Sequence, residues 1–200
     1  MKLIWALLLG LSLSAPVLAE VPDPKQAVQT ATDELLGKLE EVRPLYAEDP
    51  DQFFAAIDEA LSPFIDFEGF SRGVMAKYYR RATDEQKAEF SETFRTALIR
   101  TYGKALIEFD NQKIVVLEPS LDPKRPNRAT IALEIHGANN AIYPVEYSLT
   151  LEDNRWLLRN VSIEGINIGL QFRSQFASFM SQYRNDIDQV IENWTVDASS

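Results

Sequence analysis

Apolar residues along this chain follow two different spacings, one typical of helices and one typical of strands. Up to about residue 109 they recur every three or four positions, from about 113 to 164 they alternate with polar residues, and after that the helical spacing returns. Helices, then strands, then helices again is the order of an α+β fold. We therefore expect a curved antiparallel sheet of about four strands packed against a helical layer.

Three of the expected helices begin at recognisable capping residues. In each, an Asp or Thr precedes the first turn and a Gln follows three residues later, an arrangement that satisfies free N–H groups of that turn. The helices are expected over residues 24–42, 53–61 and 83–108, and a shorter one within residues 63–80. The capping pairs are Asp23 and Gln26, Asp49 and Gln52, and Thr83 and Gln86.

Four strands are expected, over residues 113–117, 130–135, 143–151 and 156–164. The Asp153–Asn154 pair predicts a tight hairpin turn between the last two, because both residue types tolerate the left-handed conformation that such a turn requires. Pro144 has no N–H to donate, so it predicts an edge strand or a bulge. In the last strand, simple alternation puts Leu157, Val161 and Ile163 on one face and Trp156 and Leu158 on the other.

The first nineteen residues have the parts of a secretory signal: Lys2 as the charged head, an apolar core over residues 3–13, and small residues before a cut after Ala19. That core is too short to span a bilayer, which takes about 20 residues. We expect one exported domain over residues 20–200, located in the periplasm. The chain has no cysteine, so its stability must come from burial without disulfides.

Charge and residue types narrow the chemistry. The formal net charge is −10, from 20 basic and 30 acidic residues, and loss of Lys2 with the signal leaves −11. Nucleic acid is disfavoured as a partner, because its binding depends on clustered cations and the one dense cluster, residues 77–81, is short. His136 is the single histidine, and without cysteine the sequence offers no Cys/His pair or multi-histidine zinc site. We expect no metal and no cofactor.

Three carboxylates are the candidates for acid–base chemistry. Asp66 and Glu68 stand in an otherwise aromatic segment, and Glu164 ends the last strand. Ser174 lacks the glycines of a nucleophile elbow. The alternative function is therefore an enzyme that acts on a small apolar substrate through one of these carboxylates. Our main expectation is that the protein is not an enzyme and has no catalytic residue.

The segment VSIEGINIGLQFRSQFASFM, residues 161–180, brings many large apolar groups to a junction of strand and helix. Such a stripe is usually core, but several residues expected to face inward are Tyr or Met, and Tyr favours a boundary with something polar. Gly165 and Gly169 leave the same place without side chains, which indicates either a tight turn or an opening.

Two stretches of the chain resemble a known family. KYYRRATDEQKAEFSETFRTALIRTYGKAL, residues 77–106, and RWLLRNVSIEGINIGLQFRSQF, residues 155–176, are similar to the MlaC family, also called the toluene tolerance family. The resemblance covers about residues 22–194. One departure is Phe172, where the family pattern suggests a tyrosine, so a hydrogen bond from that position is in doubt.

The resemblance implies a soluble periplasmic phospholipid carrier. It implies a cone of the nuclear transport factor (NTF2-like) type, with lipid tails in an apolar cavity between sheet and helices and the head group at its mouth. The phospholipid would be cargo, exchanged with an inner-membrane MCE ring and ABC transporter complex and with an outer-membrane lipoprotein–porin complex. A third possibility is a periplasmic chaperone that uses its aromatic surface.

Inward periodicity and nearness to the 161–180 junction select the residues expected to touch lipid. The candidates are Val74, Met75, Tyr78, Tyr102, Ile135, Tyr147, Val161, Ile163, Ile166, Phe172 and Phe176. Lys77 and Arg173 are the candidates for contact with the head-group phosphate, because charged donors make the stronger hydrogen bonds to phosphate oxygens.

Overall fold

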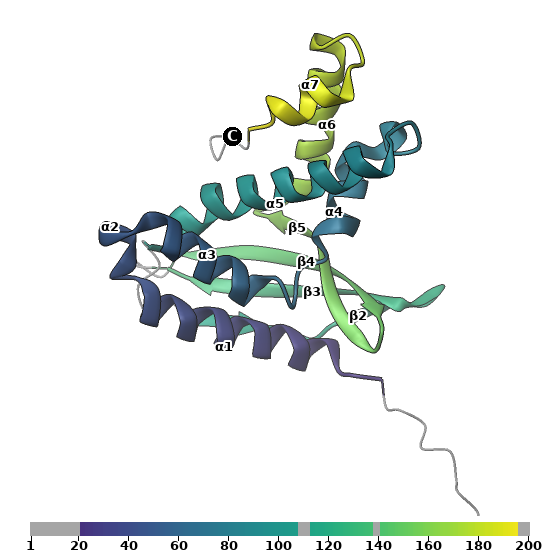
Figure 1. Ribbon diagram of the computed structural model, residues 1–200. Coiled ribbons are helices and arrows are strands. Elements are labelled where there is room, and N and C mark those ends of the chain that lie inside the picture. Colours follow the sequence, from purple (N-terminus) through teal and green to yellow (C-terminus); the bar gives the residue numbers. More distant parts are fainter. Residues whose placement is uncertain (1–20, 108–112, 138–140, 196–200) are drawn as a thin grey trace, which may run out of the picture.

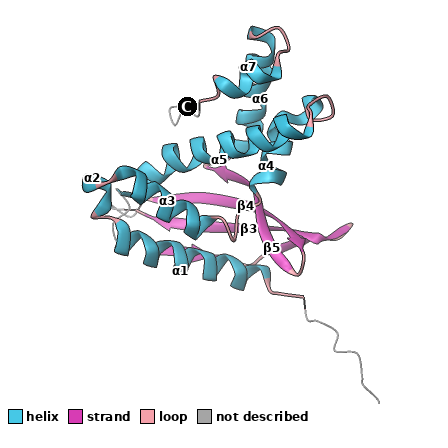
Figure 2. Ribbon diagram, viewed as in Figure 1, coloured by secondary structure: helices cyan, strands magenta, loops and turns pink. Residues whose placement is uncertain are grey.

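The structure is a computed structural model that describes residues 21–107, 113–137 and 141–195. The expected signal sequence and its cut after Ala19 lie outside these residues. The described chain is α+β, with an antiparallel sheet and helices along it, as predicted (Figures 1 and 2). None of the described helices is long and apolar enough to cross a membrane.

The helices begin where the capping residues place them. Asp49 Oδ1 accepts a hydrogen bond from Gln52 N at 3.1 Å, and Thr83 and Gln86 each bond the other's backbone N–H, at 3.2 and 3.0 Å. Asp23 also caps its helix but accepts from Lys25 N. The helices are α1 (Pro24–Val42), α2 (Leu45–Glu48), α3 (Pro50–Leu61), α4 (Phe67–Met75), α5 (Asp84–Ile107), α6 (Ile168–Gln182) and α7 (Ile187–Glu192), with a 3-10 turn η1 (Ala76–Tyr78).

The sheet has six strands where about four were expected. They are β1 (Lys113–Val116), β2 (Ser120–Asp122), β3 (Arg125–His136), β4 (Ile142–Glu152), β5 (Arg155–Ile163) and β6 (Ile166–Asn167). All pairs are antiparallel, in the order β1-β3-β4-β5-β6, and β2 pairs with the first half of β3. The two strands missing from the prediction, β2 and β6, are three and two residues long, too short to show alternation.

The predicted hairpin turn is confirmed, whereas the predicted faces of β5 are wrong. Asp153 and Asn154 both have positive φ, at 47° and 60°, as the tight turn requires. Ser148 pairs with Asn160 but Leu149 pairs with Leu158, so Arg159 is an extra, bulged residue. The bulge shifts the alternation by one position. Trp156, Leu158, Val161 and Ile163 therefore all pack in one cluster instead of on opposite faces.

Pro144 does not mark an edge. Strand β4 lies between β3 and β5, and Pro144 pairs with Glu134 near the start of the strand. The irregularity in β4 falls between Ser148 and Leu149 instead. Pro144 lies beyond the last pair of β4 with β5, Val145 with Ile163, so its missing N–H falls at the end of that ladder. Its carbonyl accepts a hydrogen bond from Glu164 N at 2.9 Å.

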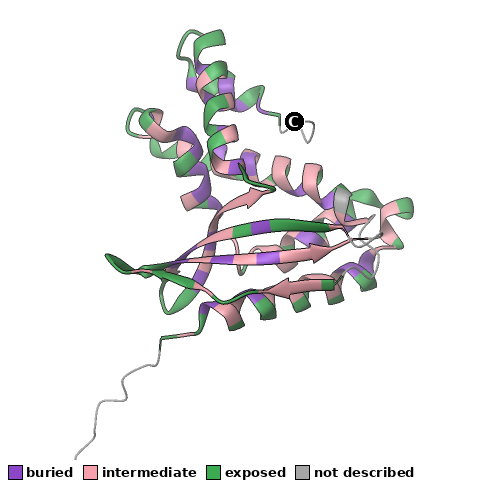
Figure 3. Cartoon of the chain, turned by 180° about the vertical axis from the view of Figure 1, so that it is seen from behind, coloured by how far each residue is buried: buried purple, intermediate pink, exposed green. Residues whose placement is uncertain are grey.

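The described core consists of three clusters. The sheet cluster joins the helix-facing side of β3, β4 and β5 to Val28 of α1. The three-helix cluster joins α1, α3 and α5 around Phe53 and Ile57. The C-terminal cluster joins α4, α5, α6 and α7. Of these helices, α6 and α7 extend away from the sheet beyond α5 (Figure 1). Seen from behind, the strands lie in front of α1, α3 and α5, so these helices share one face of the sheet (Figure 3).

Candidate functional site

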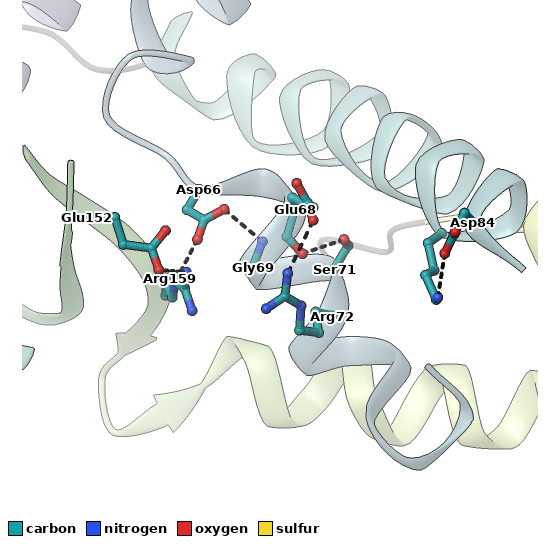
Figure 4. Close-up of polar contacts among 9 residues, drawn as sticks. Asp66, Glu68, Gly69, Ser71, Arg72, Asp84, Glu152 and Arg159 are labelled. Atoms are coloured by element: carbon teal, nitrogen blue, oxygen red, sulfur yellow. Dashed lines mark hydrogen bonds and ion pairs between the residues drawn. The ribbon is translucent and has the colours of Figure 1, made fainter. Parts of the chain in front are cut away.

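The bulge in β5 anchors α4 to the sheet. Arg159 lies between two carboxylates: its Nε is 2.5 Å from Asp66 Oδ2 and its Nη2 is 2.5 Å from Glu152 Oε1 (Figure 4). Asp66 is also the N-cap of α4, because its Oδ1 accepts from Gly69 N at 2.7 Å. The segment before α4 also forms two backbone hydrogen bonds with Leu158. Asp66 N donates to Leu158 O at 3.0 Å, and Leu158 N donates to Phe64 O at 2.8 Å.

The next residue, Asn160, holds the start of α6 against β5. Its Oδ1 accepts a hydrogen bond from Gly169 N at 2.9 Å, and a Cβ at position 169 would overlap that oxygen. Gly165 has φ +82° in the turn from β5 to β6. The two glycines therefore serve a tight turn and a close approach of helix to strand. The region around 165–169 is packed against β5.

Four of the predicted lipid-binding residues lie deep in the C-terminal cluster: Val74, Met75, Phe172 and Phe176. Phe172 and Phe176 contact the rings of Phe94 and Phe90, with centroids 5.4 and 4.9 Å apart, and both also contact Trp194. Tyr78 stands at the margin of this cluster, 5.8 Å from the Phe176 ring. Ile166 is 50% exposed on β6.

Five predicted residues are apolar or aromatic, face the interior and yet stay partly exposed: Tyr102, Ile135, Tyr147, Val161 and Ile163. Val161 and Ile163 contact both the sheet cluster and the C-terminal cluster. Burial raises the pKa of the Tyr102 and Tyr147 phenols above its usual range, because the charged phenolate loses solvation there. The tyrosines thus combine partial exposure with a poorly hydrated setting.

Three further residues belong with these five, and sequence analysis missed them as candidates. Leu98 of α5 contacts the C-terminal and three-helix clusters, and Ile65 contacts the sheet and three-helix clusters. Phe64 lies against Tyr147, with ring centroids 6.3 Å apart. Leu98 was identifiable from its place on the apolar face of its helix. Phe64 and Ile65 lie in the short connection between α3 and α4, where no periodicity marks the inward side.

The two head-group candidates lie in different settings. Arg173 lines a groove of about 260 Å³ between α4 and α6, together with Phe70, Val74 and Leu170. Lys77 is an exposed residue of η1, and its Nζ lies 4.9 Å from the centre of the Tyr78 ring. Arg173 therefore combines a cation with an apolar groove, and Lys77 does not border that groove.

The carboxylates offer little for acid–base chemistry. Asp66 has one oxygen in a helix cap and the other in an ion pair, Glu68 is exposed and pairs with Arg72 at 3.2 Å, and Glu164 is exposed in a turn. His136 pairs with Glu134 at 3.1 Å at the end of β3. Within the described ranges, no three His, Cys, Asp or Glu residues are grouped to hold a metal ion.

The fold and the site define an α+β protein whose interior is lined by apolar and aromatic side chains that are partly exposed. The sequence matches the model of the MlaC protein family over residues 29–196. It is 41% identical over 172 residues to the toluene tolerance protein Ttg2D of Pseudomonas putida, which covers 86% of this chain and 79% of that protein. The chain belongs to the MlaC family, which confirms the predicted resemblance.

Two other proteins are also similar. The intermembrane phospholipid transport system binding protein MlaC of Haemophilus influenzae is 27% identical over 93 residues, 46% of this chain and 44% of that protein. A phospholipid-binding protein from Ralstonia solanacearum, solved in complex with a phospholipid, shares the fold with a TM-score of 0.77. It is 22% identical, and the match covers 86% of this chain and 94% of that one.

Proposed function

We propose that this protein is a periplasmic phospholipid carrier that holds acyl chains between its sheet and its helices and performs no covalent chemistry. Its family membership supports this function, as do the names of the Haemophilus relative and of the Ralstonia structure. The proposal includes an NTF2-like cone with an apolar cavity and export by the signal at residues 1–19.

One observation carries the proposal: the apolar side chains where the three clusters meet are only partly buried. In a solid core the central residues are the most deeply buried, because side chains fill the interior to crystal-like density. Here Leu98, Val161 and Ile163 each contact two clusters and still retain accessible surface. Hydrocarbon is the kind of ligand that would cover such surface.

The burial of each residue assigns its role toward the lipid. Tyr102, Ile135, Tyr147, Val161 and Ile163 would touch the acyl chains. Val74, Met75, Phe172 and Phe176, which have almost no accessible surface, would form the wall behind them. Tyr78 and Ile166 would stand at the margins. Arg173 would meet the phosphate from its groove between α4 and α6, and Lys77 would remain a more distant cation.

Enclosure follows from the energetics of the cargo. Each methylene hidden from water contributes about 0.8 kcal/mol, so two acyl chains with about thirty methylenes represent on the order of 20 kcal/mol. When the lipid leaves a membrane, a carrier must supply most of this free energy by hiding the acyl chains from water again, which requires an enclosed site. By family resemblance, the exchange partners are an inner-membrane MCE ring with its ABC transporter and an outer-membrane lipoprotein–porin complex.

A larger side chain at position 161 should prevent the protein from holding phospholipid. Val161→Trp adds an indole where acyl chains are proposed to lie, and we expect the folded variant to carry at most about a tenth of the phospholipid of the natural protein. Native mass spectrometry measures the added lipid mass. Val115→Trp is the matched control, because Val115 pairs with Glu134 and faces away from the helices. Natural protein that carries no lipid and takes none from vesicles would contradict the proposal.

A further inference from the structure

The face of the sheet opposite α1 is hollowed. The hollow has a volume of about 520 Å³ and is bounded by β2 and the turn after it, by the first half of β3, by the second half of β4 and by the bulge in β5. Ligand sites in proteins are typically about 300–1,000 Å³. The hollow therefore has the size of a site for a small molecule.

Strand register fills this hollow with polar side chains. Ser120 pairs with Thr130, Thr130 with Ser148, and Ser148 with Asn160, which makes one row across four strands. Directly paired residues point to the same face of a sheet. In the adjacent row Arg128 pairs with Thr150.

One member of these rows, Thr150, is largely buried as a residue, yet its hydroxyl oxygen keeps accessible surface and has no hydrogen-bond partner among the described residues. Thr150 is only 4% exposed, although it faces away from the helices. In the described part of the chain, no side-chain hydrogen bond is formed by the hydroxyls of Ser120, Thr130, Ser148 or Thr150, whereas Asn160 bonds to Gly169. Free hydroxyls at the floor of a hollow are donors available to a ligand.

The charges around the hollow leave one cation uncompensated. Arg125 pairs with Asp122, with Nε 2.7 Å from Oδ2, and Arg159 pairs with Asp66 and Glu152. Arg128 is exposed and forms no ion pair with any described residue. The residues that line the hollow include three arginines, Arg125, Arg128 and Arg159, and one carboxylate, Asp122, in a chain of formal net charge −10. From these contacts we infer that the hollow binds a small oxyanion of the phosphate type, with Arg128 as its cation and the Thr150 hydroxyl as a second donor.

This inference does not depend on the acyl-chain proposal, because the two places lie on opposite faces of the sheet. The test is an NMR titration of the isotope-labelled mature chain with sodium phosphate and with glycerol 3-phosphate at constant ionic strength. We expect saturable shifts of the amides of residues 128–130 and 148–150. Arg128→Gln and the isosteric Thr150→Val should each weaken binding at least about tenfold, because charge-assisted and hydroxyl bonds to the oxyanion are lost.

Arg80→Gln is the matched control, because Arg80 is also an exposed arginine and lies outside the hollow. It should leave the affinity unchanged. Shifts that do not saturate, that persist in Arg128→Gln, or that Arg80→Gln weakens equally would overturn the inference. Sedimentation with phosphatidylglycerol vesicles identifies the source: sedimentation that Arg128→Gln abolishes indicates a phosphate on a lipid surface, and binding of the soluble probes alone indicates a free phosphate compound.

Discussion

Single residues decide how closely the helices approach β5. A methyl group at Gly169 would overlap Asn160 Oδ1 and lie 3.1 Å from its Cγ and 3.4 Å from Phe70. We expect Gly169→Ala to lower the free energy of unfolding by about 1–3 kcal/mol, the usual cost of overpacking. Chemical denaturation monitored by circular dichroism measures the change.

The chain contains a matched control for this prediction. Gly37 lies in the exposed face of α1, and a Cβ there would meet nothing within 4 Å. Gly37→Ala should raise the free energy of unfolding by about 0.5–1 kcal/mol, because alanine loses less backbone entropy in a helix. If both substitutions shift stability in the same direction, the close approach at Asn160 is not the cause.

At the scale of elements, the bulge at Arg159 determines which side chains of β5 face the helices. Deleting Arg159 would remove the extra residue, so Trp156 and Leu158 could no longer share a face with Val161 and Ile163. We expect the deletion to prevent folding. Arg159→Gln keeps the residue count and loses only the ion pairs, so it should cost about 1–3 kcal/mol.

Thermal unfolding and solubility of the two variants distinguish the roles of Arg159. A deletion variant as stable as Arg159→Gln would show that β5 packs against the helices equally well with or without the extra residue. A Gln variant that fails to fold would show that the ion pairs with Asp66 and Glu152, not the extra residue, hold the strand in place.

The helix starts and strand β5 show what sequence patterns can and cannot predict. Helix starts were predictable because capping is local: Thr83 and Gln86 lie within one turn and bond each other. The residues of β5 that face the helices were not predictable, because the bulge at Arg159 is defined only by the pairing of β5 with β4. Nor could burial be ranked within the candidate site. Phe172 and Val161 both fit an inward pattern, but only the assembled clusters show that one is enclosed and the other partly exposed.

At the scale of the whole molecule, two tyrosines can report whether the interior holds lipid. Burial already raises the pKa of Tyr102 and Tyr147 above the ordinary value near 10. The folded protein therefore keeps these protons at a pH where the unfolded chain loses them. Their contribution to stability is complete below pH 10 and is lost as the pH rises above it.

Acyl chains beside these two phenols would displace the remaining water and disfavour the phenolate further. We therefore expect Tyr102 and Tyr147 to ionise at higher pH in the lipid-loaded protein than in the emptied protein, as measured by phenolate absorbance. Tyr102→Phe and Tyr147→Phe should together remove the difference. Tyr183→Phe should preserve it, because Tyr183 packs on Phe179 at the far end of α6. Identical titrations with and without lipid would place the acyl chains away from both tyrosines, and the interior would then have to be occupied by something other than the cargo.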